Sequence, residues 1–394
     1  MSAFPQDTDL GWRRRLRSRV LRWYDTNGRK LPWRESADPY RIWISEIMLQ
    51  QTTVAAVVPY FERFLKRFPD VQSLAAAEQE QVLRLWEGLG YYSRARNLHK
   101  AAGVIFNEYG GTFPESAEEL KLLPGIGPYT AGAISSFAFN HPAGILEANT
   151  LRLYSRLIEL DIDPRGTAGQ KLLWKFASWV VSRQRAADFN QAVMDIGSQV
   201  CRPADPECVK CPLMASCKAY EAGRHLEIPL EKKKTEITDV VEVSIAVRRG
   251  NQFLLRQRSE NERWVGLWDF VRFEVSADVG DSISIPDKKR TKVATLPGQQ
   301  SLFPSEAMAE LNLLPLEIVR QVEEQTGVVV SAYDGVTQIR HAVTRYRIRL
   351  LCLACDIDGG RLQRGSGYKW CTAKELEELP LSTTGRQFAD LLTD

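Results

Sequence analysis

Four closely spaced cysteines constrain this chain more than any other feature of its sequence. Cys201, Cys208, Cys211 and Cys217 follow the spacing C-x6-C-x2-C-x5-C. Four thiolates so close together can surround one metal centre, so the segment is expected to wrap around a metal. No histidine lies among them, and the whole chain holds only four. A zinc site is the alternative, although zinc sites usually contain two C-x2-C pairs and this segment has one.

The other cysteines are expected to be ordinary core residues. The chain has seven cysteines, an odd number, which argues against a disulfide scaffold. Cys352 and Cys355 lie in an apolar, strand-like stretch, where residues three apart point to opposite faces. Together with Cys371 they are best explained as buried thiols.

The length of 394 residues predicts two domains. A hydrophobic content of 44% and a charged content of 26% are typical of a globular protein. No apolar run is long enough to span a bilayer, and Met1–Leu10 shows no signal-peptide pattern, so we expect a cytoplasmic protein without a membrane anchor.

The apolar spacing changes character along the chain. From Pro39 to about Tyr220 it is helical, with a helix expected from Tyr40 to about Phe64 after the Asp38-Pro39 start signal. Beyond a charged linker at 226–239, strand-like patterns appear at 240–247, 252–256, 268–273 and 346–355, with a helix expected at 305–326. We therefore predict a mainly α domain at 1–225 and an α+β domain at 240–394, the latter with a disordered insertion at 277–304.

Six arginines crowd the segment from Arg13 to Arg22, whereas the formal net charge of the chain is only +3. An apolar stripe lies beneath them, formed by Leu16, Val20, Trp23 and Tyr24. Two interpretations stay open, a solvated helix face and a phosphate-facing patch.

A second strong motif is the run Leu122–Ala131, in which Gly125 and Gly127 flank one isoleucine. Such a turn joins two helices and directs its backbone N–H groups outward. Those groups lie at the N-terminus of the following helix and suit a DNA phosphate.

With these motifs in place, the chain resembles the MutY-type adenine DNA glycosylases of the helix-hairpin-helix superfamily. The matching segments are Leu31–Arg34, Ser45–Thr52, Gly88–Leu98, the glycine turn, Phe189–Gln191 and the cysteines. The resemblance implies a 4Fe–4S cluster on the four cysteines. It also implies a bacterial-type, nucleoid-associated monomer that acts on double-stranded DNA containing A:8-oxoguanine or A:G mispairs.

By this resemblance, Glu46 is the catalytic general acid that protonates adenine N7. The residues after it are Ile47, Met48 and Leu49, so its surroundings are expected to be apolar and to raise its pKa. The cation that develops on the sugar needs a nearby anion. Where the family carries aspartate, this chain has Glu147, which is one methylene longer, and Asn149 matches the asparagine that supports that carboxylate.

Tyr129 occupies the position where the related glycosylase/lyases carry a lysine that attacks the sugar. A phenol cannot form a Schiff base, so the resemblance implies a monofunctional glycosylase without lyase activity.

The remaining roles are also carried over from the motifs. Trp33, Arg34, Met48 and Gln191 are expected to line the pocket for the flipped adenine, and Gln51 and Tyr92 to wedge into the duplex. Ordinary packing is the alternative for each, with more weight for Trp33 and Met48 than for Gln51.

The C-terminal part resembles the Nudix-like domain that recognises 8-oxoguanine opposite the adenine. Arg320–Val328 keeps the Nudix helix pattern but has glutamine at two carboxylate positions, which argues against pyrophosphatase activity. In the lesion-reading loop, Thr344 retains a hydroxyl, whereas Arg345 introduces a fixed charge. We expect both to contact DNA.

Gln299–Phe303 resembles the short peptide by which bacterial proteins dock on the replication sliding clamp. Two rival functions remain open at this stage. One is a glycosylase/lyase acting on oxidised pyrimidines or T:G mispairs, against which Tyr129 and the C-terminal domain argue. The other is a non-catalytic DNA-damage-binding protein in which Glu147 has lost its function, against which the retention of Glu46 argues.

Overall fold

The computed structural model describes residues 10–230, 236–285 and 312–393. The chain divides into two compact units. The first is drawn from Met1–Leu85 and Arg94–Lys234, and the second from Thr235–Asp394 together with Trp86–Ser93. The short segment Trp86–Ser93 therefore belongs to the second unit, although the residues on both sides of it in sequence belong to the first. No helix in the described part of the chain is long and apolar enough to cross a bilayer.

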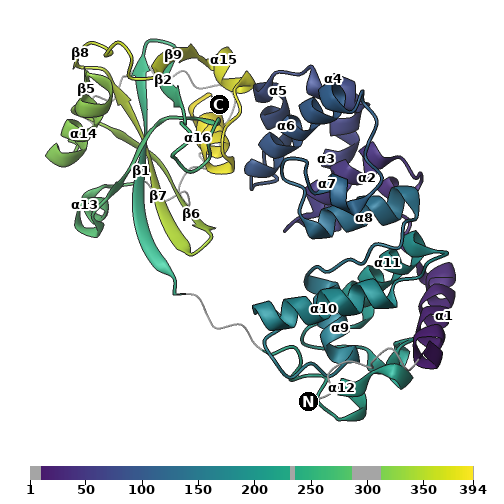
Figure 1. Ribbon diagram of the computed structural model, residues 1–394. Coiled ribbons are helices and arrows are strands. Elements are labelled where there is room, and N and C mark those ends of the chain that lie inside the picture. Colours follow the sequence, from purple (N-terminus) through teal and green to yellow (C-terminus); the bar gives the residue numbers. More distant parts are fainter. Residues whose placement is uncertain (1–9, 231–235, 286–311, 394) are drawn as a thin grey trace, which may run out of the picture. The chain divides into compact units, whose positions relative to one another are not determined.

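The first unit is helical, as predicted (Figure 1). Its elements are α1 (Leu10–Asn27), η1 (Pro32–Arg34), α2 (Pro39–Leu49), α3 (Val54–Arg67), α4 (Val71–Ala75), α5 (Gln79–Trp86), α6 (Ser93–Glu108), α7 (Ala117–Leu120), α8 (Pro128–Phe139), α9 (Ala148–Leu157), α10 (Thr167–Val180), α11 (Ala186–Asp195), the π-helix η2 (Ile196–Val200), η3 (Cys208–Lys210), η4 (Met214–Ser216) and α12 (Lys218–Glu221).

The single long helix expected from Tyr40 to Phe64 is wrong, because the structure breaks it into α2 and α3. The start is as predicted, since the Asp38 carboxylate accepts a hydrogen bond from the Tyr40 N–H at 2.9 Å. The break lies at Gln51, whose φ of 58° is left-handed. Thr53 then caps α3 with its hydroxyl. Polar residues between two apolar helical runs thus form a turn, which helical periodicity alone does not distinguish from a continuous helix.

Two of the arginines in α1 serve the packing of the first unit. The Arg17 guanidinium donates to the carbonyls of Trp179 at 3.0 Å and Val180 at 2.8 Å, which caps the C-terminal end of α10. Arg13 lies over the Trp179 ring at 5.0 Å. Beneath them, Leu16 and Val20 are buried among residues of α9, α10 and α11. The stripe predicted beneath the arginines is confirmed as a core-facing one.

The second unit contains a mixed sheet with the order β3-β2-β1-β7-β6, in which β4 also pairs with β1 and β9 with β2. The strands are β1 (Thr238–Arg249), β2 (Gln252–Gln257), β3 (Trp268–Asp269), β4 (Val271–Val275), β6 (Asp334–Val343), β7 (Tyr346–Asp356) and β9 (Tyr368–Thr372). A separate pair joins β5 (Val328–Val329) to β8 (Gly359–Gly360). The helices are α13 (Ala277–Ser282), α14 (Leu316–Thr326), α15 (Ala373–Glu378) and α16 (Thr383–Thr393).

Both faces of this sheet are buried. Along β7, Leu351, Leu353 and Cys355 pack into a core with α14, whereas Leu350 and Cys352 pack into a second core with α16. The alternation follows from the pleat of a strand. It confirms that Cys352 and Cys355 are buried thiols on opposite faces, and Cys371 is buried as well.

Two predicted boundaries in this domain are wrong. The insertion expected to be disordered from residue 277 begins with helix α13, whose start is capped by the Ser276 side chain. The helix expected from residue 305 has its first helical residue at Leu316 in the described segment, because Leu313 pairs with Ala332 in a β-bridge and Pro315 directly precedes the helix. The clamp-like peptide Gln299–Phe303 lies outside the described residues.

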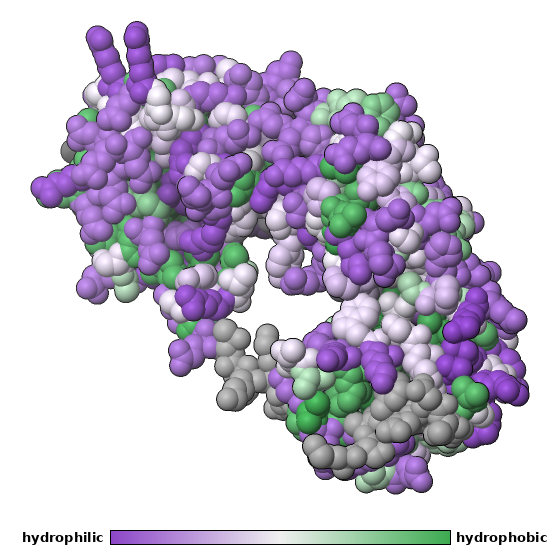
Figure 2. Space-filling model, viewed as in Figure 1, coloured by the Kyte–Doolittle hydropathy of each residue, from purple (hydrophilic) through white to green (hydrophobic). Residues whose placement is uncertain are grey.

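Hydrophilic residues cover most of the face shown in Figure 2.

Candidate active site

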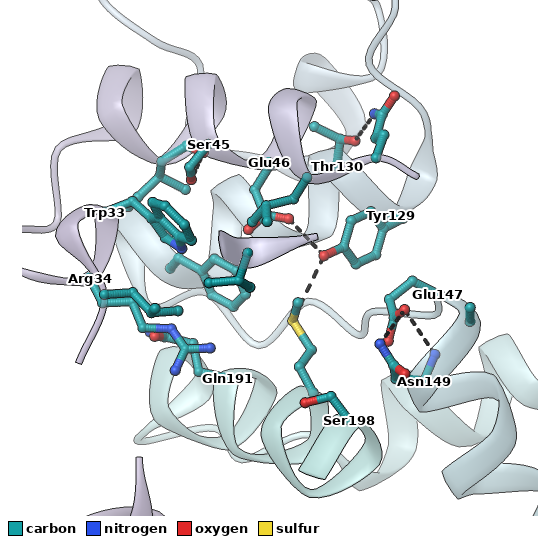
Figure 3. Close-up of a pocket in the computed structure, with 18 of the residues that line it drawn as sticks. Trp33, Arg34, Ser45, Glu46, Tyr129, Thr130, Glu147, Asn149, Gln191 and Ser198 are labelled. Atoms are coloured by element: carbon teal, nitrogen blue, oxygen red, sulfur yellow. Dashed lines mark hydrogen bonds between the residues drawn. The ribbon is translucent and has the colours of Figure 1, made fainter. Parts of the chain in front are cut away.

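A large pocket in the first unit gathers most of the predicted site residues (Figure 3). Its walls come from η1, α2, α8, the start of α9 and α11. The predicted residues that line it are Trp33, Arg34, Glu46, Gln51, Gly125, Gly127, Tyr129, Glu147, Asn149 and Gln191.

Glu46 lies on α2 with only 3% of its surface exposed. The Tyr129 hydroxyl, from the first turn of α8, donates a hydrogen bond to Glu46 Oε2 at 2.6 Å. Burial raises the pKa of Glu46 to about 7, and the hydrogen bond from Tyr129 and the charge of Arg34 oppose this rise. The elevated pKa that its apolar neighbours predicted is therefore present, and a large share of Glu46 is protonated at neutral pH.

Glu147 is the N-cap residue of α9, and its side chain folds back on its own helix. Its two carboxylate oxygens accept the backbone N–H groups of Asn149 and Thr150, each at 2.8 Å, and the Asn149 side-chain amide adds a third bond at 3.2 Å. The pKa of Glu147 is raised above its usual value, because burial outweighs the backbone hydrogen bonds from Asn149 and Thr150 that lower it. The extra methylene is thus accommodated by a capping box.

The two carboxyl groups have different surroundings. Glu147 accepts three N–H donors and Glu46 accepts one phenolic hydroxyl. The negative charge of Glu147 also raises the pKa of Glu46. In Figure 3 the Tyr129 ring lies between them. The N–H donors around Glu147 stabilise the charged form of its carboxylate, whereas Glu46 accepts only the Tyr129 hydroxyl.

Hydrogen bonds connect Asn149 to the cysteine segment. The Arg152 guanidinium donates to Asn149 Oδ1 at 3.0 Å and to the Cys201 carbonyl at 2.7 Å. It also donates to the carbonyl of Gly197 in the π-helix η2. A Cβ added to Gly197 would lie 2.9 Å from the Asn149 Cβ, so glycine permits this close approach.

Asp195 is a site residue that the sequence analysis missed. It is fully buried, and Arg34 donates to its two oxygens at 2.8 and 3.1 Å while Arg29 Nε donates at 2.6 Å. Although burial opposes ionisation, the hydrogen bonds and charges of Arg34 and Arg29 lower the pKa of Asp195. The available signal was its spacing, because Asp195 lies four residues after Gln191 and so on the same helix face.

The other pocket residues differ in their burial and in their hydrogen bonding. Trp33 is buried, and its ring packs edge-on against Phe61 at 5.4 Å between centroids. Gln191 accepts a hydrogen bond from the Tyr24 hydroxyl at 2.9 Å. Gln51 is exposed at the pocket rim with its left-handed backbone. An exposed residue with a left-handed backbone at a pocket rim is typical of a residue that contacts a ligand.

The prediction that Met48 lines the pocket is wrong. Its side chain is fully buried, and it is not among the residues of the pocket wall, which on α2 are Ile42, Ser45, Glu46 and Leu49. The reason is helical geometry, because a residue two positions after Glu46 points about 200° away around the helix.

Tyr92 is 5% exposed, and its hydroxyl donates to the Leu381 carbonyl at 3.3 Å within the second unit. This burial favours the packing alternative for Tyr92. Its neighbour Tyr91 is half exposed and has a left-handed φ of 48°.

The predicted glycine turn is present between α7 and α8. Gly125 has a φ of 76°, and a Cβ at this position would lie 2.6 Å from the Asn97 Cβ, so this residue must be glycine. Around Gly127 the space is open. Within the described residues, the backbone N–H groups of Gly125 and Gly127 have no hydrogen-bond acceptor. They remain available to an anion.

The four cysteines line one small cavity together with the apolar side chains of Leu153, Leu157 and Leu213. Burial raises the pKa of Cys211 to about 12 and that of Cys217 to about 11. The Arg156 guanidinium donates to Cys201 Sγ at 3.3 Å. Within the described part of the chain, no three cysteine, histidine or acidic side chains are arranged to hold a single metal ion. The sulfurs surround a space instead.

In the second unit, Thr344 and Arg345 form a two-residue turn between β6 and β7, beyond the pair Val343 and Tyr346. Both residues are exposed, and Thr344 has a left-handed φ of 54°. The Arg345 guanidinium lies over the Tyr346 ring at 5.2 Å, as does that of Arg263 at 5.5 Å. The hairpin tip therefore presents the Arg345 guanidinium and the Thr344 side chain, whose hydroxyl donates to the Val343 carbonyl at 2.7 Å, whereas Arg263 is paired with Glu242.

Helix α14 carries the segment that resembles a Nudix helix. Gln325 accepts a hydrogen bond from Tyr368 at 3.1 Å, and Tyr368 accepts one from Arg256 at 3.1 Å. Arg256 is in turn paired with Glu262. Gln325, one of the two glutamines that replace carboxylates of the Nudix helix pattern, is thus part of a hydrogen-bond network with Tyr368 and Arg256.

Comparison with known proteins gives matches to both units. The family model of the HhH-GPD superfamily base excision DNA repair proteins matches residues 44–178, and the NUDIX domain model matches residues 243–391. The adenine DNA glycosylase of Buchnera aphidicola (subspecies Schizaphis graminum) is 36% identical over 303 residues, which cover 75% of this chain and 85% of that protein.

The human adenine DNA glycosylase is 43% identical over 215 residues, covering 52% of this chain and 39% of the human protein. Among solved structures, a thermostable thymine-DNA glycosylase aligns with a TM-score of 0.49 at 30% identity, covering 54% of this chain and 98% of that one.

Proposed function

Because the chain belongs to the adenine DNA glycosylase family, we propose that it removes adenine paired with 8-oxoguanine or guanine, using Glu46 as general acid and Glu147 as the stabilising anion. The family assignment makes it a base-excision repair enzyme that hydrolyses an N-glycosidic bond in DNA. We further propose the base opposite the adenine, the roles of Glu46 and Glu147, and a reaction without lyase activity.

One observation carries the assignment of roles, namely the contrast between the two buried carboxyl groups. Glu46 has a pKa of about 7 and one hydrogen-bond donor, so it can hold a proton and release it. Glu147 is held by three N–H groups that stabilise its charged form. Two buried carboxyl groups with such different hydrogen-bond donors suit general-acid catalysis beside a developing cation.

In the proposed reaction, adenine enters the pocket after leaving the base stack. The Glu46 proton passes to adenine N7, and the electron pair of the glycosidic bond leaves with the base. The sugar then carries oxocarbenium character, which the Glu147 charge stabilises until water adds to the anomeric carbon. Arg34, Trp33 and Gln191 line the pocket where the base would bind.

Tyr129 supports a monofunctional reaction. Its phenol lies at the pocket wall and is bonded to Glu46, and burial raises its pKa well above the ordinary value. A neutral phenol offers no amine for a Schiff base, so strand cleavage through that route is not expected.

DNA contacts are proposed for three features. The unpaired N–H groups of Gly125 and Gly127 suit a phosphate, because they lie beside the N-terminus of α8. Gln51, which is exposed and has a left-handed backbone conformation, would enter the duplex. Thr344 and Arg345 at the hairpin tip would contact the base opposite the adenine, where the hydroxyl can bond to 8-oxoguanine and the guanidinium to phosphate.

We also propose a 4Fe–4S cluster on Cys201, Cys208, Cys211 and Cys217. Their cavity suits such a group, because the four cysteines line it together and four cysteine ligands are what a 4Fe–4S cluster requires. The cluster would tie the loop to α9 and so support Asn149 through Arg152.

Two further proposals concern assembly. The chain is expected to act as a monomer, and Gln299–Phe303, outside the described residues, would dock on the replication sliding clamp. Replacing Leu302 and Phe303 with alanine should abolish capture by the clamp, and unchanged capture would refute this role.

Single-turnover cleavage of duplexes with adenine opposite 8-oxoguanine, guanine or cytosine tests the main proposal. Each product is analysed with and without alkali. Alkali-dependent breaks opposite 8-oxoguanine and guanine, lost in Glu46→Gln, are the expected result. Breaks that form without alkali would contradict the monofunctional reaction. Tight binding without base loss from any duplex would instead identify a damage-binding protein.

A further inference from the structure

His225 is a buried polar group whose hydrogen bonding the described protein residues leave incomplete. Its Nδ1 atom is buried and has no hydrogen-bond partner. Buried ring nitrogens in native proteins almost always have a partner, so such an atom indicates a missing group. The His225 ring lines the same cavity as the four cysteine thiols.

The position of this ring is well determined by its neighbours. The His225 ring faces the Tyr220 ring at 5.4 Å between centroids. Next to it, Arg224 forms ion pairs with Glu159 at 3.3 Å and Asp161 at 2.6 Å, beyond the end of α9. The segment that carries His225 is therefore anchored to the element that also carries Arg152 and Arg156.

A second link joins this segment to the cysteine loop. Arg156 donates through Nε to the Ile228 carbonyl at 2.8 Å and through Nη1 to Cys201 Sγ at 3.3 Å. One buried guanidinium thus holds the turn after His225 against the first cysteine. These contacts fix the backbone on both sides of His225 close to the cysteine loop.

We propose that His225 donates a hydrogen bond from Nδ1 to a sulfur atom of the iron–sulfur cluster and thereby helps to set the reduction potential of the cluster. This inference rests on the proposed cluster. A neutral imidazole carries one N–H, and cluster sulfurs accept hydrogen bonds. Hydrogen bonds to the sulfurs stabilise the more negative, reduced form, so they raise the potential.

The first measurement is the iron and sulfide content of the purified full-length chain. A protein without iron contradicts the cluster itself. If the cluster is present, histidine labelled with ¹⁵N gives a clean probe, because the chain has only four histidines. Electron–nuclear double resonance on the paramagnetic cluster should show a ¹⁵N coupling and an exchangeable proton that D₂O removes. An iron-loaded protein without this coupling refutes the role of His225.

Variants identify the residue. His225→Phe keeps an aromatic ring without a donor, so it should lose the coupling and lower the midpoint potential. In His225→Asn, the side-chain amide nitrogen takes the position of Nδ1, and the potential should stay near that of the unaltered protein. His141→Phe, a histidine outside this cavity that pairs with Glu115, is the matched control.

An unchanged potential in an iron-loaded His225→Phe protein would overturn the inference. If His225→Phe does not retain iron, the ¹⁵N measurement on the unaltered sequence decides the question by itself.

Discussion

Replacing Glu46 with glutamine should inactivate the enzyme and, at alkaline pH, make it more stable. The two effects have one cause, which is that a carboxyl group is buried where it accepts a single hydroxyl hydrogen bond. Glutamine has nearly the same shape, and its carbonyl oxygen can still accept the hydrogen bond from Tyr129. It cannot protonate a leaving base, so the single-turnover rate should fall by roughly 10²–10⁴-fold.

The magnitude of the stability effect follows from the pKa. In the folded protein the pKa of Glu46 is raised from 4.5 to about 7, mainly by burial. At 1.36 kcal/mol per pKa unit, the difference amounts to about 3 kcal/mol. The folded state binds the proton more tightly than the unfolded state. This contribution is therefore fully present below pH 4.5 and is lost as the pH rises through about 7.

Glutamine does not titrate, so the variant avoids this loss. Relative to the unaltered protein, Glu46→Gln should gain about 2.5 kcal/mol of stability between about pH 5 and pH 8. For a domain of this size, that corresponds to roughly 5–10 °C in melting temperature. The rate of the unaltered enzyme should also decline above pH 7, because only the protonated form of Glu46 is active.

The assay compares melting temperatures of the two proteins by circular dichroism at both pH values. Glu62→Gln, which removes an exposed glutamate from α3, controls for the loss of one carboxyl group. A difference between Glu46→Gln and the unaltered protein that does not grow with pH would show that Glu46 is not buried in its charged form. The assigned roles of the two carboxyl groups would then be wrong.

Variants at three further positions test the rest of the site. Asp195→Asn leaves the Arg34 guanidinium without its buried counter-charge. Unfolding measurements should show that the free energy of unfolding falls by about 3–5 kcal/mol. An unaltered free energy of unfolding would contradict the pairing. Glu147→Gln removes the anion and should slow single-turnover base loss by roughly 10²–10³-fold. Glu147→Asp keeps the charge, so it should reduce the rate much less. Equal reductions in rate for the two variants would refute the electrostatic role. Gly125→Ala forces a Cβ to within 2.6 Å of the Asn97 Cβ at a φ of 76°, so binding to undamaged duplex should weaken in a fluorescence titration. Unchanged affinity would contradict a phosphate contact at this turn.

Much of the architecture follows from local patterns. The helical and strand-like regions, the glycine turn and the buried thiols were predictable because each depends on residues close together in sequence. In β7, alternation with a period of two was sufficient to assign Cys352 and Cys355 to opposite cores. Glu46 was identified from a motif, and its apolar neighbours predicted the direction of its pKa shift.

Other features depended on packing between distant segments. Only the tertiary structure shows that Asp195 binds Arg34 from 161 residues away and that Met48 points away from the pocket. The same holds for the turn at Gln51, where the capping of α3 by Thr53 ends what would otherwise be one helix.

The sequence by itself determined which chemical groups are present and which of them share a helix, strand or turn, because those relations follow from backbone geometry and short-range hydrogen bonding. The tertiary structure decided which groups are deprived of water and which charges face one another. The pKa of Glu46, the pairing of Asp195 with Arg34 and the position of His225 beside the cysteines all depend on such contacts, because desolvation and Coulomb interactions depend on distance in space rather than along the chain.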